Sequence, residues 1–386
     1  MIPYGRQSLD TADFHAVQQA LRSDWLTQGP AIPAFEQALA TRMGAPFAVA
    51  SNSATSSLHL ACLALGLQPG DSLWTSPNTF VASANCARYC GADVDFVDID
   101  PATRNLSAER LKDKLVQAKR NGRLPKIVVP VHFAGHPCNM EAIGALSQEF
   151  GFRVIEDASH AVGATYQGEP VGCGTFSDVT IFSFHPVKII TTAEGGAALC
   201  RDPAIAAAMA RLRSHGIVRG AELTSGSTDP WAYEQVELGF NYRMTELQAA
   251  LGLSQLAKLD AFIERRRAIR RAYDDAFADL GQLRLPVERE DVRCAWHLYA
   301  VAVNNPAWRR PLFEALRAAD LGVQVHYIPV HTQPYYRALG FAPGMFPAAE
   351  DYYARAISLP MFPAMTDGDV ATVIDVVRKA VHAVCR

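Results

Sequence analysis

The chain has 386 residues, of which 49% are hydrophobic and 19% charged, a composition that indicates a folded globular protein with room for two domains. Its 36 basic and 39 acidic residues give a net charge of −3, which argues against a nucleic-acid-binding surface. No apolar run approaches the roughly 20 residues that span a bilayer, and the first residues lack the basic and apolar regions of a signal peptide.

The first 160 residues alternate between helical and strand patterns. The predicted strands are Phe47–Ala50, Ser72–Thr75, Val94–Ile99, Lys126–Val131 and Arg153–Glu156, and the predicted helices are 12–22, 33–43, 55–65, 80–90, 107–120 and 140–150. Strands separated by helices in this way predict a mostly parallel sheet with helices on both faces.

The middle of the chain adds two strands, a loop and a helix. Val179–Phe184 and Gly196–Cys200 are predicted strands joined by a tight polar turn, an arrangement that places one antiparallel strand in the sheet. Residues 217–240 are rich in Gly, Ser and Thr and predict a long functional or mobile loop. Residues 244–275 have the leucine spacing of one long helix.

The last hundred or so residues change character. Strand patterns at Leu298–Val303 and Gln324–Tyr327 alternate with helical patterns at 310–319 and 368–383. We therefore expect two domains, a large one over residues 1–255 and a smaller α+β one over residues 256–386.

Eight cysteines are scattered along the chain, and none forms a C-x-x-C pair. Cys62 and Cys200 lie in apolar stretches and are expected to be packed thiols. Scattered thiols in a long chain indicate a reducing, cytoplasmic setting. His132 and His136 near Cys138 lack a second cluster of ligands, so no metal site is expected.

Lys188 is the first candidate for chemistry. The chain has only seven lysines, and this one follows the apolar strand that ends at Phe184. A buried amine is costly unless it is paired or used, and desolvation lowers its pKa in a way that suits Schiff-base formation. A strand-end lysine that reaches solvent would leave the same pattern, so the residue alone does not decide.

Asp157 ends another apolar strand about one crossover unit before Lys188. The carboxyl ends of parallel strands are where open α/β sheets bind ligands. Pyridoxal phosphate needs a carboxylate beside its ring nitrogen, which keeps the ring protonated and able to accept electrons. The alternative is an Asp that caps a helix.

A site for the phosphate of that cofactor is suggested by the predicted helix start at Ala54 and Thr55. Backbone N–H groups and hydroxyls at a helix N-terminus bind phosphate, although a plain N-cap would look alike. Ser183 offers a further hydroxyl close to Lys188. Phe80 could stack on the pyridine ring, although an aromatic residue at such a position is more often part of the core.

Several motifs together resemble the sugar-nucleotide aminotransferases of the DegT/DnrJ/EryC1/StrS family. They occur in order over almost the whole chain, at residues 52–55, 156–161, 182–188, 191–196, 239–243 and 358–360. The resemblance implies the pyridoxal-phosphate-dependent transferase fold of type I, as in aspartate aminotransferase, with a mostly parallel sheet in a large domain and a smaller α+β C-terminal domain.

Within that family, residues 2–7, 26–30, 213–217 and 324–329 are most similar to one subfamily. That subfamily aminates C4 of UDP-4-keto-6-deoxy-N-acetyl-β-L-altrosamine, with L-glutamate as amino donor, in pseudaminic acid biosynthesis. The resemblance thus implies this substrate, this donor and pyridoxal 5′-phosphate.

The resemblance also implies a role for each matching residue. Lys188 would carry the cofactor as a covalent Schiff base and shuttle a proton, Asp157 would pair with the ring nitrogen, and His160 would lie near the ring's phenolic oxygen. The phosphate would be held by Ala54, Thr55 and Ser183, with Phe80 compatible with stacking on the ring. Many members of the family have Gly in place of Ala54 and Gln in place of His160, and both variants seen here occur in the subfamily.

Other residues would act on the substrate or across a dimer. Asn241 would reach the phosphate of the other subunit's cofactor, which implies a homodimer with shared active sites. The nucleotide-sugar site would be lined by Tyr4, Asp24, Trp25, Leu26, Thr27, His326, Tyr327, Ile328 and Pro329.

Two alternatives stay open on the sequence. The same fold could aminate another 4-keto nucleotide sugar, such as a UDP-4-keto-pentose or a GDP- or dTDP-linked hexose. The second alternative is a homologue that binds pyridoxal phosphate but does not catalyse transamination. Some relatives are dehydratases in which a histidine replaces the lysine, so the presence of Lys188 argues against this alternative.

Overall fold

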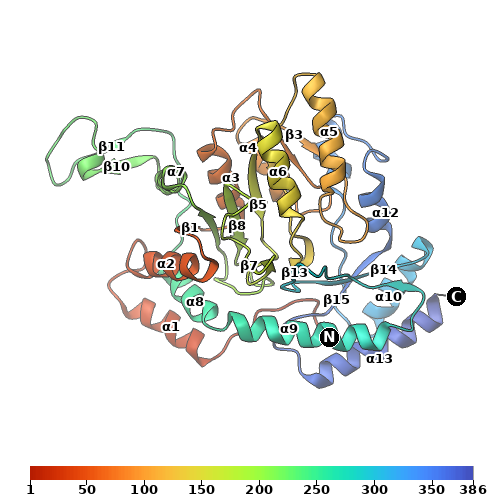
Figure 1. Cartoon of the computed structure of the whole chain (residues 1–386). Coiled ribbons are helices and arrows are strands. Elements are labelled where there is room, and N and C mark those ends of the chain that lie inside the picture. Colours follow the sequence, from red (N-terminus) through yellow and green to blue (C-terminus); the bar gives the residue numbers. More distant parts are fainter. Residues whose placement is uncertain (386) are drawn as a thin grey trace.

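The computed structural model describes residues 1–385, and a seven-stranded sheet of order β1-β9-β8-β5-β4-β2-β3 forms its centre (Figure 1). These strands are β1 (Phe47–Ser51), β2 (Ser72–Thr75), β3 (Asp93–Phe96), β4 (Ile127–Val129), β5 (Arg153–Asp157), β8 (Val179–Ser183) and β9 (Gly196–Cys200). All neighbours pair in parallel except β9, which is antiparallel to both β1 and β8. The predicted α/β class and the single antiparallel strand are confirmed.

Helices cover both faces of this sheet because its strands are apolar on both sides. In β9, Ala197 and Leu199 enter one apolar cluster, whereas Ala198 and Cys200 enter another on the opposite face. The first face carries α2 (Ala31–Met43), α5 (Ala108–Arg120), α6 (Met140–Phe150) and α8 (Glu246–Leu256), and the second carries α3 (Ala54–Ala64), α4 (Ala82–Tyr89) and α7 (Pro203–Arg213).

The prediction of one long helix over residues 244–275 is wrong, because α8 ends at Leu256 and α9 (Leu259–Phe277) begins after a two-residue break. Lys258 lies in the break, and its Nζ pairs with Asp10 at 2.9 Å and with Asp13 at the start of α1 (Thr11–Arg22). The apolar spacing continues across the break, so the sequence pattern does not reveal it.

The Gly- and Ser-rich segment 217–240 forms a hairpin of β10 (Ile217–Arg219) and β11 (Tyr233–Gln235). Figure 1 shows it as an arm that projects from the body beyond α7. Large apolar side chains on and beside the arm are open to solvent, with Trp231 74% and Leu238 80% exposed. The predicted long loop is therefore a two-stranded arm with a long connection.

The C-terminal part is built on a second sheet of order β12-β14-β15, made of β12 (Leu283–Arg284), β14 (Tyr299–Val303) and β15 (Ala356–Leu359). The helices of this part are α10 (Arg309–Ala318), α11 (Pro334–Ala338), α12 (Pro347–Arg355) and α13 (Asp367–Val384). A third sheet of order β13-β6-β7 joins β13 (Val292–Arg293) to β6 (Thr165–Tyr166) and β7 (Glu169–Pro170). The expected domain boundary after residue 255 falls at the end of α8 and stays a prediction.

Gln324–Tyr327 is not a strand, which corrects the sequence prediction. Only Gln324 bridges to Ser358, through backbone hydrogen bonds of 3.2 and 2.7 Å, and the chain then turns so that His326 and Tyr327 line a cavity. The β-branched and aromatic pattern predicted a strand, but these two aromatic side chains face a site instead of a sheet.

The structure also bears on membrane spans, metal sites and the state of the cysteines. Within residues 1–385, no helix has both the length and the apolar character needed to cross a membrane, and no three His, Cys, Asp or Glu side chains are grouped so as to hold a metal ion. All eight cysteines are free, and Cys62 and Cys200 are buried as predicted.

Glu246 at the start of α8 joins that helix to the beginning of α2. Its carboxylate is 3% exposed and accepts hydrogen bonds from the backbone N–H groups of Gly29 at 3.0 Å, Ala31 at 2.7 Å and Ile32 at 3.2 Å. A negative charge suits the start of a helix, where backbone donors lack partners. Thr27 also bridges to Thr245, so this contact fixes the end of the loop before α2.

We expect Glu246→Gln to lower the free energy of unfolding by about 2 kcal/mol, because the amide places its NH2 group against buried donors that need an acceptor. Urea denaturation followed by circular dichroism measures the change. Glu222→Gln, at an exposed position, is the matched control and should leave the midpoint where it is. Equal midpoints for both variants would contradict this account of α2.

Candidate active site

A cavity of about 420 Å³ lies at the carboxyl edge of the central sheet. Its walls come from both parts of the chain, since β5 and β8 end there and the segment after Gln324 closes it. It gathers most of the predicted site residues, namely Tyr4, Ala54, Thr55, Phe80, Asp157, His160, Ser183, Lys188, His326 and Tyr327. This edge of a parallel sheet is where the fold class places ligands.

Lys188 is carried by the segment 184–195, which connects β8 to β9 and is not the tight turn expected from the sequence. The segment is closed at its base, where the N–H of Phe184 donates to the carbonyl of Gly195 at 3.0 Å and the N–H of Thr192 donates to the carbonyl of Phe184 at 2.9 Å. The antiparallel pairing of β8 and β9 thus continues into the base, and the open end of the loop brings Lys188 into the cavity.

The amine of Lys188 is poised to lose its proton near neutral pH. Burial lowers its pKa to about 8, although the charge of Asp157 acts in the opposite direction. A neutral amine is the nucleophilic form, so a usable fraction exists at neutral pH without a separate base.

Asp157 faces the cavity because it is the last residue of β5 and lies on the side of the sheet that α3 and α4 cover. Its side chain is 5% exposed, with Oδ1 accepting from the N–H of Ser159 at 3.1 Å and Oδ2 accepting from the hydroxyl of Ser83 at 2.6 Å. Both oxygens are therefore oriented by the protein, and the carboxylate is fixed before any ligand arrives.

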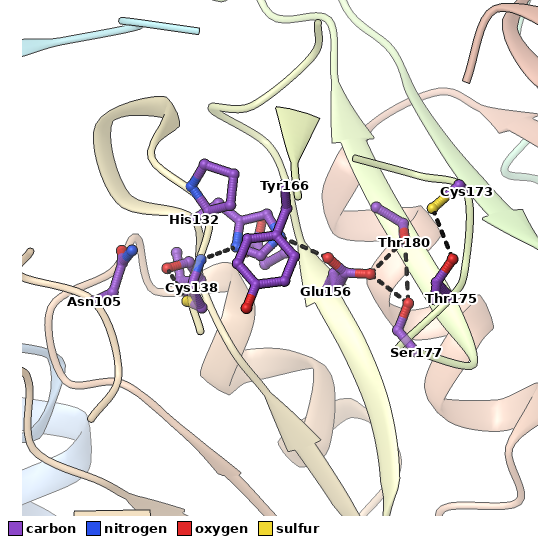
Figure 2. Close-up of polar contacts among 12 residues, drawn as sticks. Asn105, His132, Cys138, Glu156, Tyr166, Cys173, Thr175, Ser177 and Thr180 are labelled. Atoms are coloured by element: carbon purple, nitrogen blue, oxygen red, sulfur yellow. Dashed lines mark hydrogen bonds and ion pairs between the residues drawn. The ribbon is translucent and has the colours of Figure 1, made fainter. Parts of the chain in front are cut away.

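The neighbouring carboxylate, Glu156, points to the other face of the sheet and has its own partners. Figure 2 shows it between His132 and the hydroxyls of Ser177 and Thr180. The N–H of Cys138 lies 3.1 Å from Nδ1 of His132, and Nε2 of the same ring lies 2.7 Å from Glu156. Burial lowers the pKa of His132, but its contacts with Cys138 and Glu156 outweigh burial and raise the pKa to about 10. Burial alone raises the pKa of Glu156, but these hydrogen bonds outweigh it and hold the pKa below its usual value.

The N-terminus of α3 points its first amides at the cavity. The hydroxyl of Ser53 caps the N–H of Ser56 at 3.1 Å, while Ala54 and Thr55, at the first two helical positions, line the cavity. Gly196 permits this placement, because a Cβ there would lie 2.4 Å from the nitrogen of Ala54. With the hydroxyls of Thr55 and Ser183 also at the wall, this corner suits a phosphate group.

His160 and its neighbours give the opposite wall neutral hydrogen-bonding groups. The N–H of Ala134 donates to Nδ1 of His160 at 3.2 Å, so the proton lies on Nε2, which is 3.1 Å from the hydroxyl of Tyr327. Burial lowers the pKa of His160 well below its usual value, and it lowers that of His326 to about 3, with Lys188 adding to both shifts. These imidazoles are neutral, so they add no competing positive charge beside Lys188.

Several predicted residues lie away from this cavity within one chain. Trp25 and Leu26 are about half exposed, and Thr27 is held at the start of α8. Asn241 is exposed near the base of the arm, where it bridges to Ser214. The remaining predicted residues outside the cavity lining are Asp24, Ile328 and Pro329. Their roles, like those of the residues in the cavity, stay predictions.

His297 in the cavity and Ser83 behind Asp157 are among the residues that the sequence did not predict. His297 is 4% exposed and lines the cavity, with its ring centroid 4.3 Å from that of His160. It lies two residues before β14, and no local pattern shows that this part of the chain meets residue 160. Ser83 lies on α4, and the sequence around it carries no motif that signals its contact with Asp157.

The residues present fit pyridoxal phosphate. An amine of low pKa, a fixed carboxylate and a helix N-terminus flanked by hydroxyls surround one cavity, and these are the groups that its aldehyde, ring nitrogen and phosphate require. Phe80, which is 59% exposed, borders the same space.

Comparisons with known proteins agree with this donor set. The profile of the DegT/DnrJ/EryC1/StrS aminotransferase family matches residues 7–378. The spore coat polysaccharide biosynthesis protein SpsC of Bacillus subtilis is 39% identical over 385 residues, which cover 98% of this chain and 97% of SpsC. The structure of Helicobacter pylori PseC, an aminotransferase of pseudaminic acid biosynthesis, superposes with a TM-score of 0.90 at 31% identity and covers 99% of both chains. The pyridoxal-phosphate form of the putative sugar aminotransferase Spr1654 of Streptococcus pneumoniae gives 0.90 at 28% identity, also over 99% of both chains.

The low pKa of Lys188 predicts how the cofactor-free protein takes up pyridoxal phosphate. The rate of covalent uptake should rise with pH up to about 8 and then level off, because only the neutral amine is nucleophilic. Stopped-flow absorbance at about 420 nm follows the reaction. Lys188→Ala should give no such band, whereas Lys112→Ala, at an exposed position, should behave like the unaltered protein. A rate that does not change with pH would contradict the assignment.

Proposed function

The chain belongs to the DegT/DnrJ/EryC1/StrS aminotransferase family, and on this premise we propose that it aminates C4 of one particular nucleotide-linked keto sugar. The enzyme is a pyridoxal-phosphate-dependent sugar aminotransferase. The proposed reaction converts UDP-4-keto-6-deoxy-N-acetyl-β-L-altrosamine into UDP-4-amino-4,6-dideoxy-N-acetyl-β-L-altrosamine, with L-glutamate as donor, in the cytoplasm. The similarity to PseC over the full length of both chains carries this proposal.

The proposed chemistry runs in two half-reactions. Glutamate delivers its nitrogen and leaves as 2-oxoglutarate, and the keto sugar then takes the nitrogen at C4. Pyridoxal phosphate, when bound, supplies the ring that accepts electrons from the carbon losing its proton. Lys188 takes and returns that proton, and the low pKa of its amine supports this role.

Other side chains bind and orient. Asp157 is proposed to accept from the protonated ring nitrogen, and Ala54, Thr55 and Ser183 to hold the phosphate. His160, with its proton fixed on Nε2 by Ala134, is oriented to donate toward the ring's phenolic oxygen or to Tyr327.

The sugar is proposed to enter from the side of Tyr4, His326 and Tyr327. Burial raises the pKa values of Tyr4 and Tyr327, so both phenols keep their protons and can donate to sugar hydroxyls or the keto oxygen. The nucleotide would extend toward the segments 24–27 and 328–329.

A second candidate keeps the mechanism and changes the sugar. The similarity to SpsC, whose name refers to spore coat polysaccharide, favours another 4-keto nucleotide sugar destined for a surface polysaccharide. UDP-4-keto-pentoses and GDP- or dTDP-linked hexoses belong to this group.

A homodimer with shared sites is also proposed. The exposed apolar side chains of the arm, including Trp231 and Leu238, need cover, and Asn241 lies at the base of the arm, outside the cavity of its own chain. A second copy that receives the arm would bring Asn241 to the partner's phosphate site.

The substrate proposal is tested with a panel of freshly made 4-keto nucleotide sugars and glutamate. We expect kcat/KM to be highest for UDP-4-keto-6-deoxy-N-acetyl-β-L-altrosamine, by at least about tenfold, because a site that hydrogen-bonds one sugar rejects those that leave its polar groups unpaired. NMR of the product reports the configuration at C4. A higher kcat/KM for a UDP-4-keto-pentose or a GDP- or dTDP-linked hexose would replace this substrate with the second candidate.

The shared site is tested by complementation between two inactive variants. Lys188→Ala and Asn241→Ala homodimers are mixed, dissociated and reassociated. Each hybrid dimer then has one site with both residues intact, so about a quarter of the unaltered activity should return. Sites confined to one chain would give no recovery beyond the activity of the two separate variants, and light scattering would reveal a monomer.

A further inference from the structure

We propose that Ser83 is a positioning residue which, by donating a hydrogen bond to Asp157, keeps the shared proton on the ring nitrogen of the cofactor. The proposal rests on the proposed pairing of Asp157 with that nitrogen. Ser83 itself does not line the cavity, so it would act through Asp157 and not on the substrate.

The contact is short and fully enclosed. Ser83 is 0% exposed on α4, and its hydroxyl lies 2.6 Å from Oδ2 of Asp157. The carbonyl of Phe80 is a poorer acceptor for the same proton, at 3.4 Å. An O–H donor to a carboxylate at this distance belongs to the strong, charge-assisted class of hydrogen bonds.

A second hydroxyl, that of Thr79 in the wall of the cavity, contacts Ser83. Thr79 Oγ1 lies 2.7 Å from the oxygen of Ser83, and Thr79 is 2% exposed. A hydroxyl has one proton, and that of Ser83 is directed at Asp157, so Thr79 donates to Ser83. The result is a chain from Thr79 through Ser83 to Asp157, in which each bond polarises the next.

The carboxylate cannot turn away from this donor. Oδ1 of Asp157 is held by the N–H of Ser159, and on the reverse face of β5 the side chain of Glu156 is fixed by its own partners (Figure 2). The strand end is thereby held from both sides of the sheet, and Ser83 meets Asp157 in one geometry.

The chemical consequence follows from competition for one proton. A carboxylate facing a protonated pyridine leaves the proton on nitrogen as long as the carboxylate is the weaker base. A hydrogen bond to its charged form weakens it as a base, and loss of that bond moves the proton toward oxygen. The ring then withdraws electrons less strongly, and removal of the substrate proton by Lys188 becomes slower.

The test uses the cofactor-loaded enzyme with Ser83→Ala and, as matched control, Thr180→Val. Thr180 is also fully buried and donates to a carboxylate, but to Glu156 at 3.1 Å on the opposite face (Figure 2). The main readout is the ¹⁵N NMR shift of enzyme loaded with ring-labelled pyridoxal phosphate, which reports where the proton lies. We expect Ser83→Ala to move this shift toward that of the neutral ring and Thr180→Val to leave it unchanged.

Kinetics give an independent readout. Ser83→Ala should lower kcat about tenfold with KM for glutamate nearly unchanged, and should raise the isotope effect on kcat with 2-deuterated glutamate. Ser83→Thr keeps the hydroxyl and should restore the ¹⁵N shift. If Ser83→Ala fails to fold, Thr79→Val replaces it, and a smaller shift in the same direction is expected because Ser83 loses the donor behind it.

Asp157→Asn separates failure of the proposal from failure of its premise. If Asp157→Asn changes the ¹⁵N shift and Ser83→Ala does not, Ser83 has no part in holding the proton and the proposal is overturned. If Asp157→Asn also leaves the shift unchanged, the proposed pairing of Asp157 with the ring nitrogen is wrong, and the proposal is lost with it.

Discussion

Enclosing a lysine amine and a carboxylate in one cavity is the constraint on which the rest of the site depends. Burial disfavours the charged form of Lys188 and lowers its pKa to about 8, while the charge of Asp157 acts in the opposite direction. The groups on the far wall are consistent with this balance, because His160, His297 and His326 all have lowered pKa values and are neutral. A cation in their place would suppress protonation of the lysine still further, and a second carboxylate would restore it.

The carboxylates at the end of β5 also connect the strand to the layers on both faces of the sheet. Adjacent strand residues point to opposite faces, so Glu156 and Asp157 need donors from different layers. Asp157 takes one from Ser83 on α4, and Glu156 takes its own from His132 and from the hydroxyls of Ser177, just before β8, and Thr180, within it. Two buried carboxylates in sequence thus hold the two faces of the strand end, each through its own separate donors.

The sequence predicted the sheet, its antiparallel strand and the residues at strand ends, because each of these leaves a local pattern. Lys188, Asp157 and Ala54 follow or begin regular elements, and the parallel sheet brings such positions to one edge. His297 and Ser83 were missed because their contacts with residues 160 and 157 join distant parts of the chain. The break at Lys258 was missed for the same reason, since the carboxylates that hold its side chain belong to the start of α1.

The two walls of the cavity carry different kinds of chemical groups. The wall built from β5, β8 and the start of α3 carries the amine of Lys188, the carboxylate of Asp157 and the amides of Ala54 and Thr55. The backbone of the sheet and of the helix places these groups, and their positions do not depend on which sugar binds. The other wall carries phenols and neutral imidazoles from Tyr4 and the C-terminal part, whose hydrogen bonds suit hydroxyl and keto groups of a sugar. We therefore expect discrimination among keto sugars to depend on the second wall and on segments that lie outside the cavity of a single chain. For this reason the reaction follows from the fold more directly than the substrate does.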